Sequence, residues 1–368
     1  MIIAIFAYVL APDNTPNANN QITEIQLENP GFKQLFLLQR KNIQEEKASF
    51  LSRLFIGKKD PHKWIPIDSY SFEEQEMGDS SLRIGQALTF ISYSYKNTSS
   101  RFRLEDVVYP LSQVSTDGQL ASLGEELNRD TEHLKQVISQ QHIVERRFLL
   151  GTDRYGRDVL SRLLIGVRIS LLVGLIAVII SLLIGIFLGS MAGYFGGRID
   201  DAIMFLINTV WSIPTLLLVF AIVLAFGKNI TNIFLAVGLT MWVDVARIVR
   251  GQVMSLKHIE FIEAAKIVGL SNYRIIQKHI LPNIIGPLTV VAAANFATAI
   301  LLEAGLSYLG FGIQAPMPSW GTMLNENYGF AISGKPIIAL VPALAILLLV
   351  LSFNLLGNGL RDAIDVKS

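Results

Sequence analysis

Five stretches of this 368-residue chain carry no Asp, Glu, Lys or Arg, and this feature restricts the fold more than any other. Each stretch exceeds the roughly 20 residues that a helix needs to cross a ~30 Å hydrocarbon core. Charged residues make up only 17% of the chain, against about 25% in ordinary soluble domains. The sequence therefore predicts a membrane protein. The stretches are 169–197, 202–227, 279–302, 304–325 and 336–360.

The spans must be helical, because an isolated segment in lipid has to satisfy its backbone hydrogen bonds internally. The 304–325 stretch is rich in Gly, Pro and Ser and is predicted to be a loop instead. A weaker span holds Asp244 and Arg247 on one helix face near its end, where charged side chains reach the interface. We predict an all-α polytopic protein with spans at about 169–192, 202–226, 229–248, 284–303 and 337–357.

Residues 1–11 add a partial span. Ile2 to Ala11 supplies only ten apolar residues, half of a full crossing. No basic leader or small-residue cleavage pattern of a signal peptide accompanies them. We therefore expect six transmembrane helices, of which the first is truncated because the sequence starts inside it; an anchor fragment is the alternative.

Lys and Arg residues in short loops favour the cytoplasmic side of a membrane. The segment 247–283 carries six of them, whereas the flanking short loops carry one each, Lys228 and Lys335. This asymmetry places 247–283 in the cytoplasm and residues 12–150 outside it.

The outer segment, residues 12–150, is long enough to form a small folded module. Alternating apolar and polar residues predict strands at 22–27 and 88–95, and helical spacing with mixed charge predicts a helix within 120–150. We therefore predict an α+β extracytoplasmic insertion that precedes a transmembrane domain at 151–368.

The cytoplasmic loop at 258–282 combines two short helical patterns with a break between them. Apolar residues recur at helical spacing over 258–268, and Gly269 permits the backbone to turn. Ser271 is a candidate N-cap for a second helix, which Pro282 is predicted to end. Two short helices held at an angle form a rigid projection that can transmit a push from a soluble partner. An ordinary amphipathic hairpin is the simpler alternative.

This loop resembles the EAA signature of permease subunits in binding-protein-dependent ABC importers. That signature reads EAA, three residues, Gly, nine residues and Ile-x-Leu-Pro, and here His279 stands in place of the usual Ile. The resemblance implies that the loop is the coupling helix that docks in a groove of an ATPase subunit. The matching residues are Glu263, Ala264, Ala265, Gly269, Leu281 and Pro282.

Further blocks are similar to the C-type permease subunit of dipeptide/oligopeptide (nickel) importers. Residues 151–170 look like the GTDxxGRDxxSRxxxGxRxS signature of that family. By its own chemistry this block predicts a basic amphipathic helix at the membrane surface, with Arg157 and Arg162 away from the apolar stripe. The other blocks are 306–312, 316–321 and 352–365, where Asn358 replaces the usual Asp.

The resemblance implies the type I ABC importer permease fold and import of di- or oligopeptides across the cytoplasmic (inner) membrane of a bacterium. The expected partners are a homologous permease in a heterodimer, two ATPase subunits, an extracytoplasmic substrate-binding protein and the lipid bilayer. The chain itself should bind no cofactor, since ATP and Mg would be held by the ATPases. Nickel chelates and oligosaccharides are alternative substrates in this family.

The residues themselves favour transport over catalysis. The sequence has no phosphate-binding G-x-x-x-x-G-K-[ST] loop, no cysteine and no metal-ligand spacing of its five histidines. We therefore predict no catalytic and no metal-binding residues, and the net charge of +1 gives no reason to expect nucleic acid. An ion-driven secondary transporter is less favoured, because it predicts several buried charges. A membrane scaffold is also less favoured, because it needs no rigid cytoplasmic projection.

Three residues are candidates for the translocation path, namely Glu303, Trp211 and Pro214. Glu303 is an intramembrane carboxylate that could attract the amino terminus of a peptide or hydrogen-bond to a neighbouring helix. Pro214 removes a backbone donor inside a span, and a structural kink is the alternative to substrate contact there. A separate stripe of small residues predicts close helix packing: Gly185, Gly189 and Gly193.

Overall fold

The structure is a computed structural model that describes residues 2–43, 49–75, 88–110 and 131–365. The chain divides into two compact units, one of residues 5–162 and the other of residues 163–368 together with residues 1–4. The division falls inside helix α6 (Val159–Phe195).

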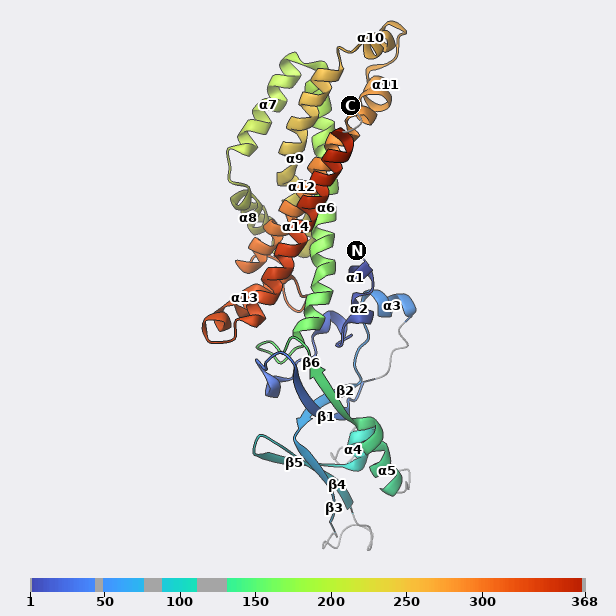
Figure 1. The fold of residues 1–368 in the computed structure, drawn as a ribbon, viewed down its shortest axis with the longest axis vertical. Helices are drawn as coiled ribbons and strands as arrows, with labels where there is room; N and C mark the ends of the chain where they lie inside the picture. Colours follow the sequence, from blue (N-terminus) through green and yellow to red (C-terminus); the bar gives the residue numbers. More distant parts are fainter. Residues whose placement is uncertain (1, 44–48, 76–87, 111–130, 366–368) are drawn as a thin grey trace. The chain divides into compact units, whose positions relative to one another are not determined.

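The unit of residues 163–368 is built from long apolar helices. Among the described residues, four helices are long and apolar enough to cross a membrane, or five segments if one bent pair counts as a single span. Figure 1 shows them running alongside one another, with α10 (Glu260–Ile267) at one end and α13 (Trp320–Ile332) at the other. The four are α6, α9 (Ile230–Leu256), the helical segment 272–308 and α14 (Ile337–Asp365).

The segment 272–308 consists of three helical pieces that follow one another directly. They are α11 (Asn272–Ile275), a π-helical turn (Ile276–Ile280) and α12 (Leu281–Tyr308). The predicted spans 169–192, 284–303 and 337–357 lie inside α6, α12 and α14, and the span at 229–248 starts one residue before α9.

The predicted span at 202–226 is broken into two helices, α7 (Gly197–Trp211) and α8 (Thr215–Phe226), that meet at 89°. Pro214 is the N-cap of α8 and has an extended ψ of 124°. Proline cannot donate to the preceding turn, and it disfavours helical geometry at the residue before it. The structural kink anticipated at Pro214 is therefore a near right-angle turn.

Residues 2–10 form two helices of four residues each, α1 (Ile2–Ile5) and α2 (Ala7–Leu10). Neither helix is long enough to span a membrane. The partial first span therefore stays a prediction.

The predicted loop at 304–325 is wrong at both ends, because α12 continues to Tyr308 and α13 begins at Trp320. Ser319 and Thr322 form a reciprocal capping box that starts α13. The irregular connection is therefore limited to residues 309–319.

The glycine stripe of α6 packs against α9. A Cβ atom built on Gly185 would lie 2.5 Å from Val245 Cβ, and one on Gly189 would lie 2.5 Å from the Ala246 carbonyl oxygen. No side chain larger than the hydrogen of glycine fits at these two positions, so the predicted close packing is confirmed. Farther along α6, Val173 joins a buried cluster with Val219 of α8, Val237 of α9 and Ala299 of α12.

In the unit of residues 5–162, the described residues form two three-stranded antiparallel sheets. The first has the order β2–β1–β6 and consists of β1 (Phe32–Arg40), β2 (His62–Ile67) and β6 (Ile143–Phe148). The second has the order β3–β4–β5 and consists of β3 (Ser69–Gln75), β4 (Leu88–Tyr95) and β5 (Thr98–Arg103).

Both faces of β1 are covered, because successive side chains of a strand point to opposite sides. Leu37 is buried in a cluster with Leu104 of α4 (Leu104–Val108) and Leu134 of α5 (Thr131–Val137). Phe36 is buried in a second cluster with Ile25 and Phe148. The α+β character predicted for the insertion is confirmed.

Local predictions for the insertion held unevenly. The strand at 88–95 is confirmed as β4, whereas the strand predicted at 22–27 is a 3₁₀ turn at Thr23–Ile25. Buried Ile22 and Ile25 are three residues apart, which is the repeat of a 3₁₀ helix. Of the predicted 120–150 helix, residues 120–130 lie outside the described residues and 131–142 are helical. Residues 143–148 are strand β6, because pairing with β1 overrides the local helical pattern.

Candidate coupling site

The loop between α9 and α12 folds as a short projection. Helix α10 is separated from α9 by residues 257–259 and ends at Ile267, with Val268 as its C-cap. Gly269 then takes a φ of +83°, a conformation that suits glycine, and Ser271 is the N-cap of α11 without a side-chain cap bond. The predicted helix, turn and second helix are all present.

The prediction that Pro282 ends the second helix is wrong. It lies in the first turn of α12, immediately after the π-helical turn at Ile276–Ile280. Nearby, the His279 carbonyl accepts a hydrogen bond from Asn283 Nδ2 at 2.6 Å. The wider π turn accommodates the missing proline donor, so the helix continues.

The inward side of the projection is buried against two long helices. Ile262 and Ala265 of α10 and Ile275 of α11 share a cluster with Val253 of α9 and Ile284 of α12. This packing fixes the projection to both helices at once.

Hydrogen bonds reinforce that attachment. Tyr194 of α6 donates its hydroxyl to Asn272 Oδ1 at 3.0 Å. Lys257 Nζ donates to the Gly193 carbonyl at 3.0 Å, and Lys266 Nζ donates to the Lys257 carbonyl at 3.3 Å. The last turns of α6 and α9 are thereby joined to the projection.

The outward side exposes apolar side chains together with charged ones. Ile267 is 85% exposed, Val268 79% and Tyr273 72%. Exposed apolar groups that gather on one surface mark an interaction site. We call the exposed residues Phe261, Glu263, Ile267, Val268 and Tyr273 of the projection together the coupling face.

The residues matched to the EAA pattern divide between the two sides. Glu263, Ala264, Gly269 and Pro282 are exposed, whereas Ala265 is buried and Leu281 packs partly into the cluster. The sequence interpretation missed the exposed apolar residues. Their signal was present, because Ile267 and Val268 lie off the apolar stripe that anchors the helix.

The three candidates for the translocation path lie in different surroundings. Trp211 is 62% exposed, and the Arg247 guanidinium lies 3.9 Å from its ring centroid. Pro214 is exposed at the 89° turn. Glu303 is fully buried and accepts a hydrogen bond from Ser307 Oγ at 2.6 Å. Only Trp211 and Pro214 share an exposed region, and the role of all three in transport stays a prediction.

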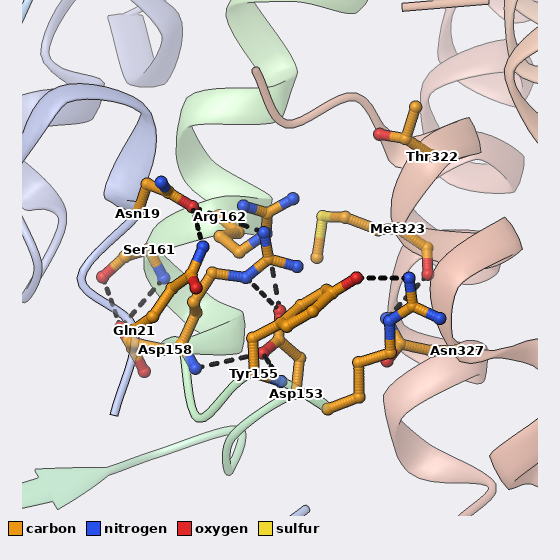
Figure 2. A network of polar contacts seen from close by, with 12 residues as sticks. Asn19, Gln21, Asp153, Tyr155, Asp158, Ser161, Arg162, Thr322, Met323 and Asn327 are labelled. Carbon is orange, nitrogen blue, oxygen red and sulfur yellow. Dashed lines mark hydrogen bonds and ion pairs between the residues drawn. The ribbon is translucent and has the colours of Figure 1, made fainter. Parts of the chain in front are cut away.

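Residues 151–162, which we call the Asp153 turn, correct the prediction of a basic surface helix. Arg157 and Arg162 are each 2% exposed. Asp153 Oδ2 lies 2.7 Å from Arg157 Nε and 3.8 Å from Arg162 Nε. Its Oδ1 accepts the backbone N–H groups of Tyr155 and Arg157 (Figure 2). The arginines are buried because a carboxylate lies within reach.

A second carboxylate of the Asp153 turn is also buried. Ser161 donates its backbone N–H to Asp158 Oδ2 at 3.0 Å, and its hydroxyl donates to the same oxygen. Burial raises the pKa of Asp158, and the hydrogen bonds from Ser161 oppose that shift.

Comparison with known proteins fits this architecture. The family described as "Binding-protein-dependent transport system inner membrane component" matches residues 185–367. The oligopeptide transport system permease protein OppC of Haemophilus influenzae is 42% identical over 231 residues, which cover 63% of this chain and 74% of that protein. The chain belongs to this family of permeases.

Other relatives of the permease carry similar names. The dipeptide transport system permease protein DppC of Bacillus subtilis is 44% identical over 235 residues, 64% of this chain and 73% of that protein. The glutathione transport system permease protein GsiD of Pectobacterium atrosepticum is 42% identical over 218 residues, 59% of this chain and 72% of that protein.

A solved chain of the MetNI methionine ABC transporter overlaps 55% of the permease with a TM-score of 0.45 at 18% identity, and 95% of that chain is covered. This similarity is too low to add to the assignment. Family membership makes the permease a multi-pass inner-membrane protein of an ABC importer, a system with ATPase subunits and a substrate-binding protein.

Proposed function

We propose that this permease imports di- or oligopeptides across the inner membrane of a bacterium, driven by ATPase subunits that dock on the coupling face. The names of its relatives refer to oligopeptides, dipeptides and glutathione, each of which is a peptide. The permease pairs with a homologous permease as a heterodimer. It has no ATPase motif, so two partner subunits bind the ATP and Mg, and the chain catalyses no reaction.

The two-sided projection is the observation that carries this proposal. Its inward side is buried against α9 and α12, whereas its outward side leaves Ile267 and Val268 largely in water. A projection without a partner would gain about 1.5–3 kcal/mol for each such side chain that it buried. A docked protein that covers the coupling face accounts for their exposure.

The inward packing supplies the route for coupling. A displacement of α10 moves Ile262 and Ala265 directly against Val253 of α9. The same valine also contacts the glycine stripe of α6, since a Cβ atom on Gly193 would lie 2.8 Å from Val253 Cβ. ATP binding by the partners would therefore shift the populations of two helix arrangements by favouring the one that fits the closed ATPases.

Two matched substitutions test the docking. Ile267→Asp places a charge on the coupling face at a residue that is 85% exposed, and Ile332→Asp does the same at an 88% exposed residue of α13. We expect Ile267→Asp to abolish co-purification of the cognate ATPase subunits and Ile332→Asp to leave it intact. Equal retention of the ATPases by both variants would refute docking on this face.

Transport assays with the assembled complex separate the alternatives. Uptake of a labelled peptide into proteoliposomes should require ATP and be reduced by unlabelled peptides. Competition by nickel chelates or oligosaccharides but not by peptides would show that the permease imports that class of substrate instead of peptides. Uptake driven by an ion gradient without ATP would instead support a secondary transporter.

A further inference from the structure

Helix α3 (Phe50–Phe55), in the 5–162 unit, exposes an unusual share of its apolar side chains. None of its residues is buried. Phe50 is 74% exposed and Leu51 62%, and Ile56, which caps the helix, is 59% exposed. A helix in water normally buries one apolar stripe, and α3 has no such buried stripe.

Solvent exposure is a costly arrangement for this segment. Isolated helices shorter than about 12–15 residues are marginal in water, and α3 has six residues. Each large apolar side chain that stays exposed forgoes about 1.5–3 kcal/mol of burial free energy. Burial of these side chains in a lipid bilayer or against another protein would therefore stabilise α3.

Helix α3 lies against α2, which carries exposed apolar residues of its own (Figure 1). The loop after α3 fits closely here, since a Cβ atom on Gly57 would lie 2.8 Å from Tyr8 Cε1. The Lys58 N–H donates to the Asn14 carbonyl at 2.9 Å. On α2, Val9 is 67% exposed and Leu10 52%. The two helices thus form one apolar area, which we call the α2–α3 surface.

We propose that the α2–α3 surface inserts into the headgroup region of the lipid bilayer and anchors the insertion to the membrane. Residues 2–11 are an unbroken apolar run in a membrane protein, so the surface continues from a lipid-compatible segment. Among the described residues 49–60, Arg53, Lys58 and Lys59 outnumber the one acidic residue, Asp60. An apolar helix with basic residues in it and after it suits a bilayer with anionic headgroups.

The same charges disfavour a second copy of this chain as the cover. A two-fold contact would bring identical patches together. It would set Arg53 and Lys58 against their own kind, with Asp60 as the one acidic residue of 49–60 to balance them. An anionic bilayer supplies opposite charge to all three basic residues.

The absence of cysteine from the whole chain permits a clean test by single-site labelling. A spin label is attached to Leu51→Cys in the full chain, which is reconstituted in vesicles of phosphatidylcholine with one quarter phosphatidylglycerol. The matched control is Ser99→Cys, an exposed residue of β5. Collisional relaxation by oxygen, which concentrates in lipid, is compared with relaxation by a water-soluble nickel chelate.

We expect the Leu51→Cys label to be accessible to oxygen and severalfold less accessible to the nickel chelate than the Ser99→Cys label. A label open to the nickel chelate would show that the α2–α3 surface faces water and would overturn the proposal. A label shielded from both reagents would show protein contact and would overturn it as well. Ile56→Cys repeats the measurement if Leu51→Cys lowers the melting temperature of the chain.

Discussion

The Asp153 turn and the coupling projection are both rich in charge, yet they use it in opposite ways. The turn buries Arg157 and Arg162 around a carboxylate. The projection buries aliphatic residues and leaves Glu263 in solvent. The difference teaches that the density of charge in a motif does not decide whether the motif faces a partner. What differs is which groups each region buries, ion-paired side chains in the turn and aliphatic ones in the projection.

The largest expected effect is on the projection. Glu263→Lys should abolish uptake, because it reverses a charge on the coupling face, while the melting temperature and membrane insertion stay close to wild type. Exposed substitutions of this kind change stability by about 0.5 kcal/mol or less. Glu24→Lys, at an exposed residue of the insertion, is the control in the same uptake assay. Normal uptake by Glu263→Lys would contradict a coupling role for the projection.

In the Asp153 turn we expect a substitution to lower the stability of the chain. Asp153→Asn leaves Arg157 and Arg162 buried without their carboxylate, and removal of one partner of a buried pair costs about 3–5 kcal/mol. We expect a strongly lowered melting temperature of the detergent-purified chain. Glu145→Gln, whose carboxylate lies 3.8 Å from Lys33 with 60% exposure, should change stability by about 1 kcal/mol or less. An Asp153→Asn chain that melts like wild type would contradict a structural role for the turn.

Packing behind the projection gives a smaller effect. Gly189→Ala places a methyl group 2.5 Å from the Ala246 carbonyl oxygen, and overpacking of this kind costs about 1–3 kcal/mol. Gly251→Ala is the matched control, since a Cβ atom there meets nothing within 4 Å. Thermal unfolding of both variants checks the prediction, and equal stability would mean that α6 and α9 are less tightly packed.

The smallest expected effect is a pH dependence of stability that arises from His142. His142 is buried and its Nδ1 lies 2.6 Å from the Leu38 carbonyl oxygen, with the His62 ring centroid 5.7 Å away. Burial lowers the pKa of His142, the hydrogen bond with the Leu38 carbonyl opposes that shift, and the nearby His62 and Arg40 assist it. The unfolded chain then binds the proton more readily. Stability should therefore fall as the pH drops below the ordinary value of about 6.5 and through the lowered pKa.

Melting curves of wild type and His142→Asn between neutral and mildly acidic pH check this dependence. The variant should show a flatter profile. Parallel profiles would assign the acid sensitivity to other groups, such as Asp60, whose Oδ1 lies 3.3 Å from His62 Nδ1.

Much of the membrane unit could be predicted because it depends on local composition. The charge-free runs around 169–192 and 337–357 appear as α6 and α14, and the break at Gly269 is a positive-φ turn. The predictions failed where distant residues decide. Burial of Arg157 depends on a turn at Gly156, whose φ is +71° and whose Cβ would lie 1.7 Å from the Ile22 carbonyl oxygen. No pattern within residues 151–170 reveals that contact.

The candidate site was predicted in part for the same reason. The motif identified Glu263 and Gly269, but it did not separate anchoring residues from outward ones. That separation depends on α9 and α12, which cover Ile262 and Ala265 and leave Ile267 free of the cluster. Strand β6 was missed because its partner, β1, lies about a hundred residues earlier in the chain.

The uninterrupted helical segment from Asn272 to Tyr308 has a mechanical consequence. Its 37 residues make a rod of about 55 Å at ~1.5 Å per residue. A rod converts a small angular change at one tip into a large sideways excursion at the other, so a tilt of about 5° would carry the far tip by roughly 5 Å. Glu303 and Ser307 lie near that tip, so a tilt at α11 would displace them, reduced by any bending at the π-helical turn or at Pro287 inside α12.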